Sequence, residues 1–405
     1  MLSARAARVT RHRRGSLMKI VIAPDSFKES LTAVETARQI EAGFREVFAD
    51  ADYRCLPIAD GGEGTVDALV AAAGGERRSA SVADPLGRPT HAAFGVLPDG
   101  TAVIEMAEAS GLHLVSPESR DPRVTSSRGT GELIRAALDA GARRFIVGLG
   151  GSATNDGGAG MLQALGAHLA DAGGRPLGPG GASLARLARI DAAGLDGRLA
   201  DCTFEVACDV DNPLVGPNGA SAVFGPQKGA TPEMVADLDR HLAHFAAIVA
   251  RDVGPDVARL PGGGAAGGLG AAMSAFLNAT LRPGVEIVTD ALRLRDAIRG
   301  ASLVVTGEGC IDGQTLRGKA PIGVARIAAE CGVPVVAIGG AVTNQADALY
   351  AHGFDAVFAS VRRACTIDEA LRDAATNVRF AARNVAAAIR IGRELGCHAS
   401  PPRVA

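Results

Sequence analysis

The sequence contains no tryptophan and only two tyrosines, and aromatic side chains make up 3% of its 405 residues. Proteins that bind single-stranded nucleic acid commonly stack the bases on aromatic side chains, so this composition argues against such a partner. The formal net charge is only −2, and a nearly neutral chain has no overall field that attracts nucleic acid or an anionic membrane. We therefore expect neither nucleic acid nor a membrane as a partner.

Cysteine follows no pattern. The seven cysteines are scattered, odd in number and without a Cys-x-x-Cys pair, whereas zinc sites and disulfide frameworks have regular spacings. No apolar run is long enough to span a bilayer. These absences predict reduced thiols in a cytoplasmic protein.

The first seventeen residues lack acidic side chains and are rich in arginine and alanine. Such a composition resembles a transit peptide. Because an apolar strand begins cleanly at Met18, we instead expect residues 1–17 to be a disordered extension or the product of a translation start placed too early.

One stretch combines a short apolar strand, a glycine-rich polar loop and a helix. The strand is predicted over Phe145–Val147, the loop over Gly148–Gly158, and the helix from Ala159. Backbone N–H groups and the positive end of the helix dipole would both point at the loop, which favours an anion there. An ordinary tight turn is the alternative, but five glycines in eleven residues favour a ligand loop.

The order of predicted strands and helices changes its pattern twice along the chain. Strands alternate with helices up to Gly74, short strands separated by tight turns follow, and the alternation returns near Ile287. We therefore predict an α/β fold in which a Rossmann-like parallel-sheet domain, discontinuous in sequence, carries a second, inserted α/β domain. The predicted ranges are 18–75 plus 288–396 for the first domain and 76–287 for the second, with the site in a cleft between them.

Two details of this prediction concern single segments. Residues 171–197 mix glycine, proline, alanine and leucine, which predicts loops and short helices. One final helix is predicted over Ile367–Arg390.

Several loops carry charged side chains directly after predicted strands. Asp25 and Lys28 follow the first strand, and Asp60 and Glu63 follow the second on a glycine-rich scaffold. Carboxylates of this kind suit Mg²⁺, which takes one or two of them and leaves its other positions to water and phosphate. Solvated turns and acids placed at a helix start are the alternatives. Asp209 and Asp211 lie on one side of an extended segment, although such pairs are also common in turns.

The segment Gly313–Ala320 fits most of a phosphate-binding P-loop. Ala320 stands where that motif requires serine or threonine, and the segment begins too far past its strand, so we reject a true Walker motif. Lys319 and Arg317 can still bind phosphate. No nucleophile elbow and no cysteine paired with histidine were found, so the pattern favours phosphoryl transfer over covalent nucleophilic catalysis.

The charged loops and glycine runs occur in an order that resembles the bacterial glycerate kinase family, the two-domain type of the galactarate and glyoxylate pathways. The resemblance rests on the segments Ala23–Leu31, Asp60–Thr65, Gly148–Gly158, Asp209–Leu214, Phe224–Ala230, Ala266–Gly270, Thr306–Gly309, and Gly318–Ala325, with Asp312 and Gln314 between the last two. It covers about residues 18–390. The sequence departs from the family in its two ends and at Gly313, where relatives often have serine.

The resemblance implies ATP-dependent phosphorylation of D-glycerate with Mg²⁺, and relatives of this type are usually assigned 2-phosphoglycerate as product. It also implies one Rossmann-like domain with a second α/β domain inserted. The resemblance does not fix the role of single residues, so the following roles are our hypotheses.

Phosphate and substrate charge would be neutralised by Lys28 and by Arg317 or Lys319. The hydroxyl proton would be accepted by Asp209 or, failing that, Asp156. Glycerate would also contact Asp25, Ser26 and Asn212. Mg²⁺ would be held by Asp60, Glu63 or Glu308. Nucleotide phosphates would approach Gly150, Gly151, Ser152, Gly267, Gly268 and Gly270.

Two other function classes stay open at this point. Glycine loops after strands also cradle dinucleotides, as in a nicotinamide-dependent dehydrogenase, but no Gly-x-Gly-x-x-Gly follows the first strand. A non-catalytic sensor of a small ligand is the second alternative. A homodimer also stays open, because nothing in the sequence bears on the oligomeric state.

Overall fold

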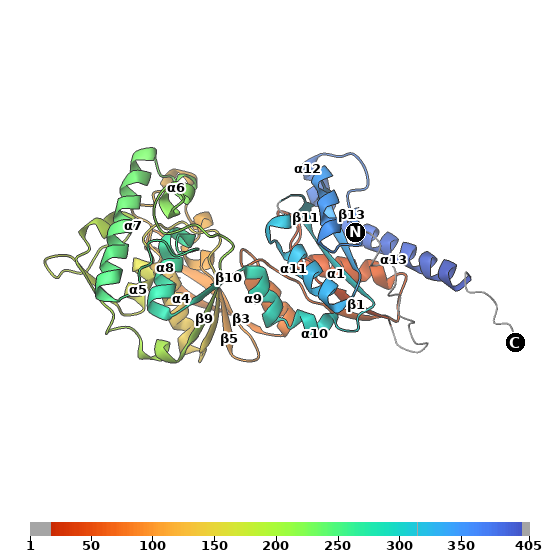
Figure 1. Cartoon of the computed structure of the whole chain (residues 1–405), viewed down its shortest axis with the longest axis horizontal. Helices are drawn as coiled ribbons and strands as arrows, with labels where there is room; N and C mark the ends of the chain where they lie inside the picture. Colours follow the sequence, from red (N-terminus) through yellow and green to blue (C-terminus); the bar gives the residue numbers. More distant parts are fainter. Residues whose placement is uncertain (1–17, 314, 399–405) are drawn as a thin grey trace.

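The computed structural model describes residues 18–313 and 315–398, and the predicted N-terminal extension lies outside that part of the chain. Two lobes lie side by side along the long axis of the molecule, each built around its own sheet (Figure 1). The predicted fold class, α/β with a parallel sheet, is confirmed.

The first sheet has five strands, and all its neighbouring pairs are parallel. Its order is β13-β12-β11-β1-β2, so strands from both ends of the chain lie side by side. The bounds are β1 (Lys19–Ile22), β2 (Asp52–Cys55), β11 (Leu303–Ile311), β12 (Val335–Val342) and β13 (Ala356–Ala359). Helices of this lobe are α1 (Ala33–Arg45), α10 (Leu294–Ile298), α11 (Ala320–Cys331), α12 (Ile367–Arg372) and α13 (Ala374–His398).

Successive side chains of a strand point to opposite faces of its sheet, and the apolar residues of β1 follow this rule. Ile20 and Ile22 pack with α1 and α13 on one face. Val21 packs with α11 on the other face. Because both faces are covered, the strand is a continuous apolar run in the sequence.

The second sheet has six strands in the order β10-β9-β6-β5-β4-β3. The pairs β3–β4 and β4–β5 are antiparallel, as the turns predicted, and the other pairs are parallel. The bounds are β3 (Glu76–Ala83), β4 (Pro89–Val96), β5 (Thr101–Glu105), β6 (Arg144–Gly148), β9 (Thr203–Ala207) and β10 (Thr280–Arg282). Helices of this lobe are α3 (Ala107–Ser110), α4 (Arg128–Asp139), α5 (Ala159–Ala164), α6 (Ala220–Phe224), α7 (Pro232–Asp252) and α8 (Ala265–Leu277).

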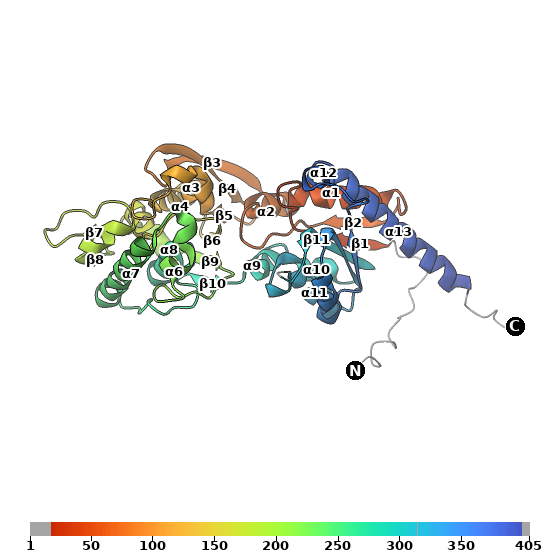
Figure 2. The same cartoon turned by 90° about the horizontal axis from the view of Figure 1, so that it is seen from above.

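Two helices lie between the lobes, α2 (Thr65–Ala73) and α9 (Gly284–Ala291) (Figure 2). Helix α2 packs on β4 and β5, and α9 packs on β9. One apolar cluster joins Val21 of the first sheet to Val103 and Ile146 of the second through these helices. The predicted boundary at 287/288 falls inside α9, so the division into two domains stays a prediction, with α2 and α9 shared between the sheets.

Two predictions about single segments are wrong. Residues 171–197 were predicted to contain only loops and short helices, but β8 (Arg189–Asp191) lies within them and pairs antiparallel with β7 (His168–Ala170), which lies just before them. The predicted final helix is two helices, α12 and α13, because the chain leaves helical geometry at Asp373, where φ is −90° and ψ is 5°. No glycine or proline marks the break at Asp373.

Short 3₁₀ helices connect several of these elements. They are η1 (Leu112–Leu114), η2 (Pro117–Ser119), η3 (Gly181–Arg186), η4 (Gly197–Asp201), η5 (Pro226–Lys228), η6 (Thr315–Arg317) and η7 (Asn344–His352). None of the helices in the described ranges is long and apolar enough to cross a membrane.

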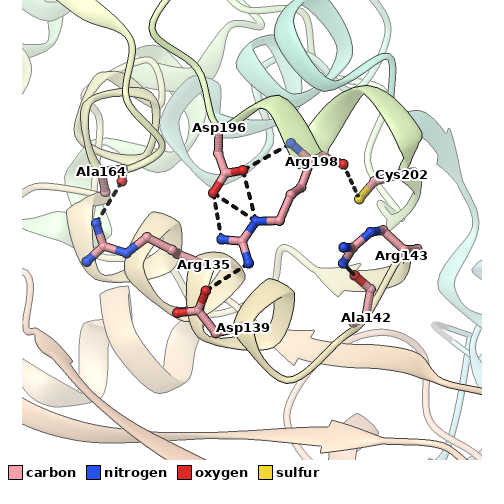
Figure 3. A network of polar contacts seen from close by, with 8 residues as sticks. All are labelled: Arg135, Asp139, Ala142, Arg143, Ala164, Asp196, Arg198 and Cys202. Atoms are coloured by element: carbon pink, nitrogen blue, oxygen red, sulfur yellow. Dashed lines mark hydrogen bonds and ion pairs between the residues drawn. The ribbon is translucent and has the colours of Figure 1, made fainter.

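An arginine fastens η4 to the end of α4 (Figure 3). Arg198 pairs with Asp139 at 2.9 Å and with Asp196 at 2.6 Å. Its hydrogen bonds lower the pKa of Asp196 to about 2. The positive charge of Arg198 is therefore matched by two carboxylates.

Candidate active site

The carboxyl ends of β1 and β11 lie side by side and bring Asp25 next to Glu308. The backbone N–H of Asp25 donates to the carbonyl of Gly307 at 2.8 Å, which continues the pairing of the two strands. Asp25 is 9% exposed and Glu308 is 5% exposed. Two acids from segments about 280 residues apart in the sequence thus lie together on the side of the five-stranded sheet where its strands end.

The pKa of Asp25 reflects this crowding. Burial and then the charge of Asp60 raise the pKa of Asp25 to about 7, and Glu308 adds to the shift. The backbone N–H of Ser26, at 2.6 Å from Oδ1, and the charge of Lys28 act in the opposite direction. The predicted residues Lys28, Asp60 and Glu308 therefore all lie within electrostatic reach of Asp25.

Glu308 is held by two donors. Its Oε1 accepts a hydrogen bond from the Thr315 hydroxyl at 2.6 Å, and its Oε2 accepts one from Lys319 Nζ at 3.0 Å. Burial lowers the pKa of Lys319, but the hydrogen bond and charge of Glu308 outweigh this effect, so the pKa is raised. Lys319 is therefore a fixed cation beside the carboxylates.

The loop after β2 reaches the second lobe. Glycines allow this approach: a Cβ on Gly148 would lie 2.1 Å from the carbonyl oxygen of Gly61, and one on Gly284 would lie 1.8 Å from that of Asp60. Only the absence of a side chain lets the backbones lie so close. Asp60 itself accepts a hydrogen bond from the Gly62 N–H at 3.1 Å.

Asp209 follows β9 and completes the cluster from the second lobe. Its Oδ1 accepts a hydrogen bond from the Gly284 N–H at 2.9 Å. Partial removal of the carboxylate from water raises the pKa of Asp209 to about 6, the Gly284 hydrogen bond opposes this shift, and the charge of Asp60 adds to it. The junction of the lobes thus gathers Asp25, Lys28, Asp60, Asp209, Glu308 and Lys319, which were all predicted site residues.

Only part of the glycine loop after β6 is open. Gly150 and Gly151 are exposed, and a Cβ on Gly150 would lie 3.2 Å from Gly62 Cα, so this tip borders the junction. Ser152 is 7% exposed and forms an isolated β-bridge with Gly111.

Asp156 has no exposed surface. Its oxygens accept hydrogen bonds from the Ser127 hydroxyl and from the backbone N–H groups of Ser127, Gly158 and Gly160. This carboxylate fastens the loop to α4 and α5, and the alternative role of Asp156 as proton acceptor stays a prediction.

The glycines at the start of α8 are also packed against protein. A Cβ on Gly267 would lie 2.0 Å from the Thr154 carbonyl oxygen, one on Gly268 would lie 2.7 Å from Gly157 Cα, and one on Gly270 would lie 2.5 Å from the Gly262 carbonyl oxygen. All three residues are buried. These glycines allow close packing of the backbone, and their approach to nucleotide phosphates stays a prediction.

The other predicted residues lie at the margin or outside the described side chains. Glu63 is exposed, and Asn212 donates its side-chain amide to the Asn218 carbonyl at 2.8 Å. Arg317 belongs to η6, but its side chain is outside the described part of the structure. No three histidine, cysteine or acidic side chains of the described ranges converge as a metal site. Asp60, Glu63 and Glu308 therefore do not form a preassembled magnesium site together.

Two residues of the site were missed from the sequence. Glu105, at the end of β5, accepts hydrogen bonds from the backbone N–H groups of Val66 at 2.7 Å and Gly64 at 3.2 Å, which anchors the loop after β2. Burial raises the pKa of Glu105 to about 7. Gly284 is the second missed residue, because its N–H donates to Asp209 while its Cα packs against the backbone carbonyl of Asp60. A single acid at the end of a strand and a single glycine match no sequence motif. Glu105 does stand out as an acid in an otherwise apolar strand, and this contrast could have indicated it.

The fold and this cluster define a two-lobed α/β protein with carboxylates and lysines gathered where the lobes meet. A model described as the glycerate kinase family matches residues 20–390. Glycerate 2-kinase of Escherichia coli strain K12 is 56% identical over 376 residues, which cover 93% of this chain and 99% of that protein. Glycerate kinase of Bacillus subtilis strain 168 is 54% identical over 379 residues, with 93% and 99% covered.

A solved crystal structure indicates the same family. The structure of a Salmonella typhimurium LT2 protein assigned as glycerate kinase 2 has a TM-score of 0.87 and 57% sequence identity, and the match covers 94% of this chain and 100% of that one. The chain belongs to the glycerate kinase family. It is therefore a kinase, and the alternatives of a dehydrogenase and of a non-catalytic sensor are excluded.

Proposed function

We propose that the chain transfers the γ-phosphoryl group of ATP to D-glycerate and forms 2-phosphoglycerate with Mg²⁺. The observation that carries this proposal is the cluster of Asp209, Asp60, Asp25, Lys28 and Lys319 at the junction of the lobes. The name of the Escherichia coli relative, a glycerate 2-kinase, supports the product. A cytoplasmic location and a possible homodimer stay predictions.

Asp209 is the proposed proton acceptor for the attacking hydroxyl. A carboxylate with a pKa of about 6 is ionised at neutral pH and is more basic than an ordinary aspartate. Its Oδ1 accepts a hydrogen bond from the Gly284 N–H. This bond fixes the orientation of the carboxylate and therefore also the position of Oδ2. Asp25 and Ser26 flank the position where the glycerate hydroxyls would bind.

Two lysines would neutralise charge on opposite sides of the transferred group. Lys28 is exposed on the loop after β1 and is assigned to the glycerate carboxylate. Lys319, held by Glu308, is assigned together with Arg317 to the phosphate oxygens. Phosphoryl transfer depends mainly on such positioning and charge neutralisation. The open backbone at Gly150 and Gly151 supplies N–H groups for the nucleotide.

The donor set fits Mg²⁺ that arrives with the nucleotide. Asp60 and Asp209 lie within electrostatic reach of each other, and in the described part of the structure each has one carboxylate oxygen that accepts no hydrogen bond. Mg²⁺ usually takes one or two carboxylates and fills its remaining positions with water and phosphate. Asp60 is the proposed ligand, and the bound ion would neutralise phosphate charge.

The test is a steady-state assay of ADP formation with ATP, Mg²⁺ and D-glycerate, followed by NMR of the product. We expect ADP formation that requires D-glycerate and stops when EDTA removes the metal, with phosphorus coupled to the proton at carbon 2. L-glycerate and NAD(P) with glycerate serve as controls. Absence of glycerate-dependent ADP formation would refute the proposal, and coupling to carbon 3 protons would correct the product.

A further inference from the structure

A cavity of about 370 Å³ lies on the flank of the five-stranded lobe, between α1, α13 and the segment that follows β13. Its lining includes Arg362, Arg379, Arg383, Glu46 and Phe380. None of these residues belongs to the candidate active site. The volume is in the range of small-molecule sites, about 300–1,000 Å³.

Arg362 is held in place from two sides. Its Nε donates to Asn377 Oδ1 at 2.9 Å, and Asn377 is only 6% exposed. Its Cζ lies 5.2 Å from the ring centroid of Phe380, a cation–π contact. Among the residues that the structure describes, Nη1 and Nη2 of Arg362 have no hydrogen-bond acceptor. The guanidinium group is therefore oriented, with its outer two nitrogens available.

The other two arginines share one carboxylate. Arg379 Nε donates to Glu46 Oε1 at 2.8 Å, and Arg383 Nε lies 3.7 Å from Glu46 Oε2. The cavity thus has three guanidinium groups and one carboxylate. In the other lobe, by contrast, Arg198 is matched by two aspartates (Figure 3). Because Glu46 balances one of the three positive charges, two of them have no protein counter-charge among the lining residues.

We propose that this cavity binds a small phosphorylated anion. Guanidinium groups match phosphate oxygens with paired N–H donors, and such bonds are stronger than neutral ones. Phe380, 44% exposed, supplies an apolar wall for the organic part of the ligand. Because the cavity lies on the flank, its occupant is distinct from the phosphate that reacts at the junction of the lobes.

The absence of tryptophan from the chain provides a local reporter. In a Phe380→Trp variant all tryptophan fluorescence comes from the cavity wall, so binding is read there and not at the active site. Orthophosphate, pyrophosphate and glycerol 3-phosphate are the probes, titrated at low and at 0.5 M salt. We expect a saturable fluorescence change with at least one probe, weakened by salt because the contacts are charged.

Two further variants locate the binding. Arg362→Ala combined with Arg379→Ala in the reporter chain should weaken the affinity at least tenfold. Arg390→Ala, on the same helix and outside the cavity lining, should leave it within twofold. The proposal is overturned if no probe gives a saturable change, or if the double variant binds as tightly as the Arg390→Ala control. Activity with glycerate is measured in parallel, so failure of this site and failure of the proposed function are separate results.

Discussion

Replacing Gly284 with alanine should separate the two carboxylates that meet at the junction of the lobes. The added Cβ would lie 1.8 Å from the carbonyl oxygen of Asp60 and 2.4 Å from its carbonyl carbon. Ordinary van der Waals contact begins at 3.4 Å, so one backbone must move by about 1.5 Å. Gly284 also donates its N–H to Asp209, so either movement displaces Asp209 relative to Asp60.

The expected loss follows from this displacement. Misplacing a catalytic group by about 1 Å can cost about 100-fold in rate. We therefore expect Gly284→Ala to lower kcat/KM for glycerate about 100-fold, which corresponds to about 2.7 kcal/mol of transition-state stabilisation. Overpacking should also lower the free energy of unfolding by about 1–3 kcal/mol. Coupled-assay kinetics and denaturant unfolding measure the two effects.

The chain offers a matched control in Gly197. A Cβ there would meet nothing within 4 Å, and its φ is not positive, so Gly197→Ala should change neither activity nor stability. Near-ultraviolet circular dichroism will show whether the Gly284→Ala chain is folded. A folded Gly284→Ala protein with kcat/KM within threefold of the parent would refute the reasoning.

Two other perturbations follow from buried ionisable groups. Burial lowers the pKa of Lys228, whose Nζ donates to the Thr154 carbonyl at 2.6 Å, from 10.5 to about 7. Between these values the unfolded chain binds a proton that the folded chain lacks, so stability rises with pH from about 7 to 10. Lys228→Met should reduce this rise by at least about 1 kcal/mol in urea unfolding at pH 7 and 9.5, and an unchanged slope would contradict the assignment. Glu105→Ala removes the acceptor of the Gly64 and Val66 N–H groups and should cost about 2 kcal/mol of stability and raise the KM for glycerate. Glu105→Gln keeps an acceptor oxygen and should lose less, so equal losses in the two variants would argue against this anchoring role.

The sequence was most informative where strands end. Continuous apolar runs marked the buried parallel strands, and the charged residues that follow them, such as Asp25, Lys28 and Asp60, do meet in space. This success has a physical cause, since the carboxyl ends of parallel strands share one edge of a sheet. The changes of rhythm near Gly74 and Ile287 likewise separated the segments that form the two sheets.

The surroundings of other residues could not be predicted, for a different physical reason. Asp156 and the glycines of 267–270 looked like site residues because acids and glycines serve catalysis and packing equally well. Their packing partners, Ser127 for Asp156 and Thr154 for Gly267, are 29 and more than 100 residues away in the chain. Composition and spacing report nothing about such distant neighbours. Gly284 was missed for the same reason, because its importance lies wholly in what surrounds it.

Asp209 is the proposed acceptor of the proton of the attacking hydroxyl, and Asp209→Asn tests this role most directly. The amide oxygen can still accept the hydrogen bond from Gly284, so the geometry is retained while the basic oxygen is lost. General-base catalysis typically contributes 10²–10⁴-fold, and we expect kcat to fall at least about 100-fold while the KM for ATP and the unfolding midpoint stay near those of the parent. A fall in kcat of less than tenfold would contradict the account.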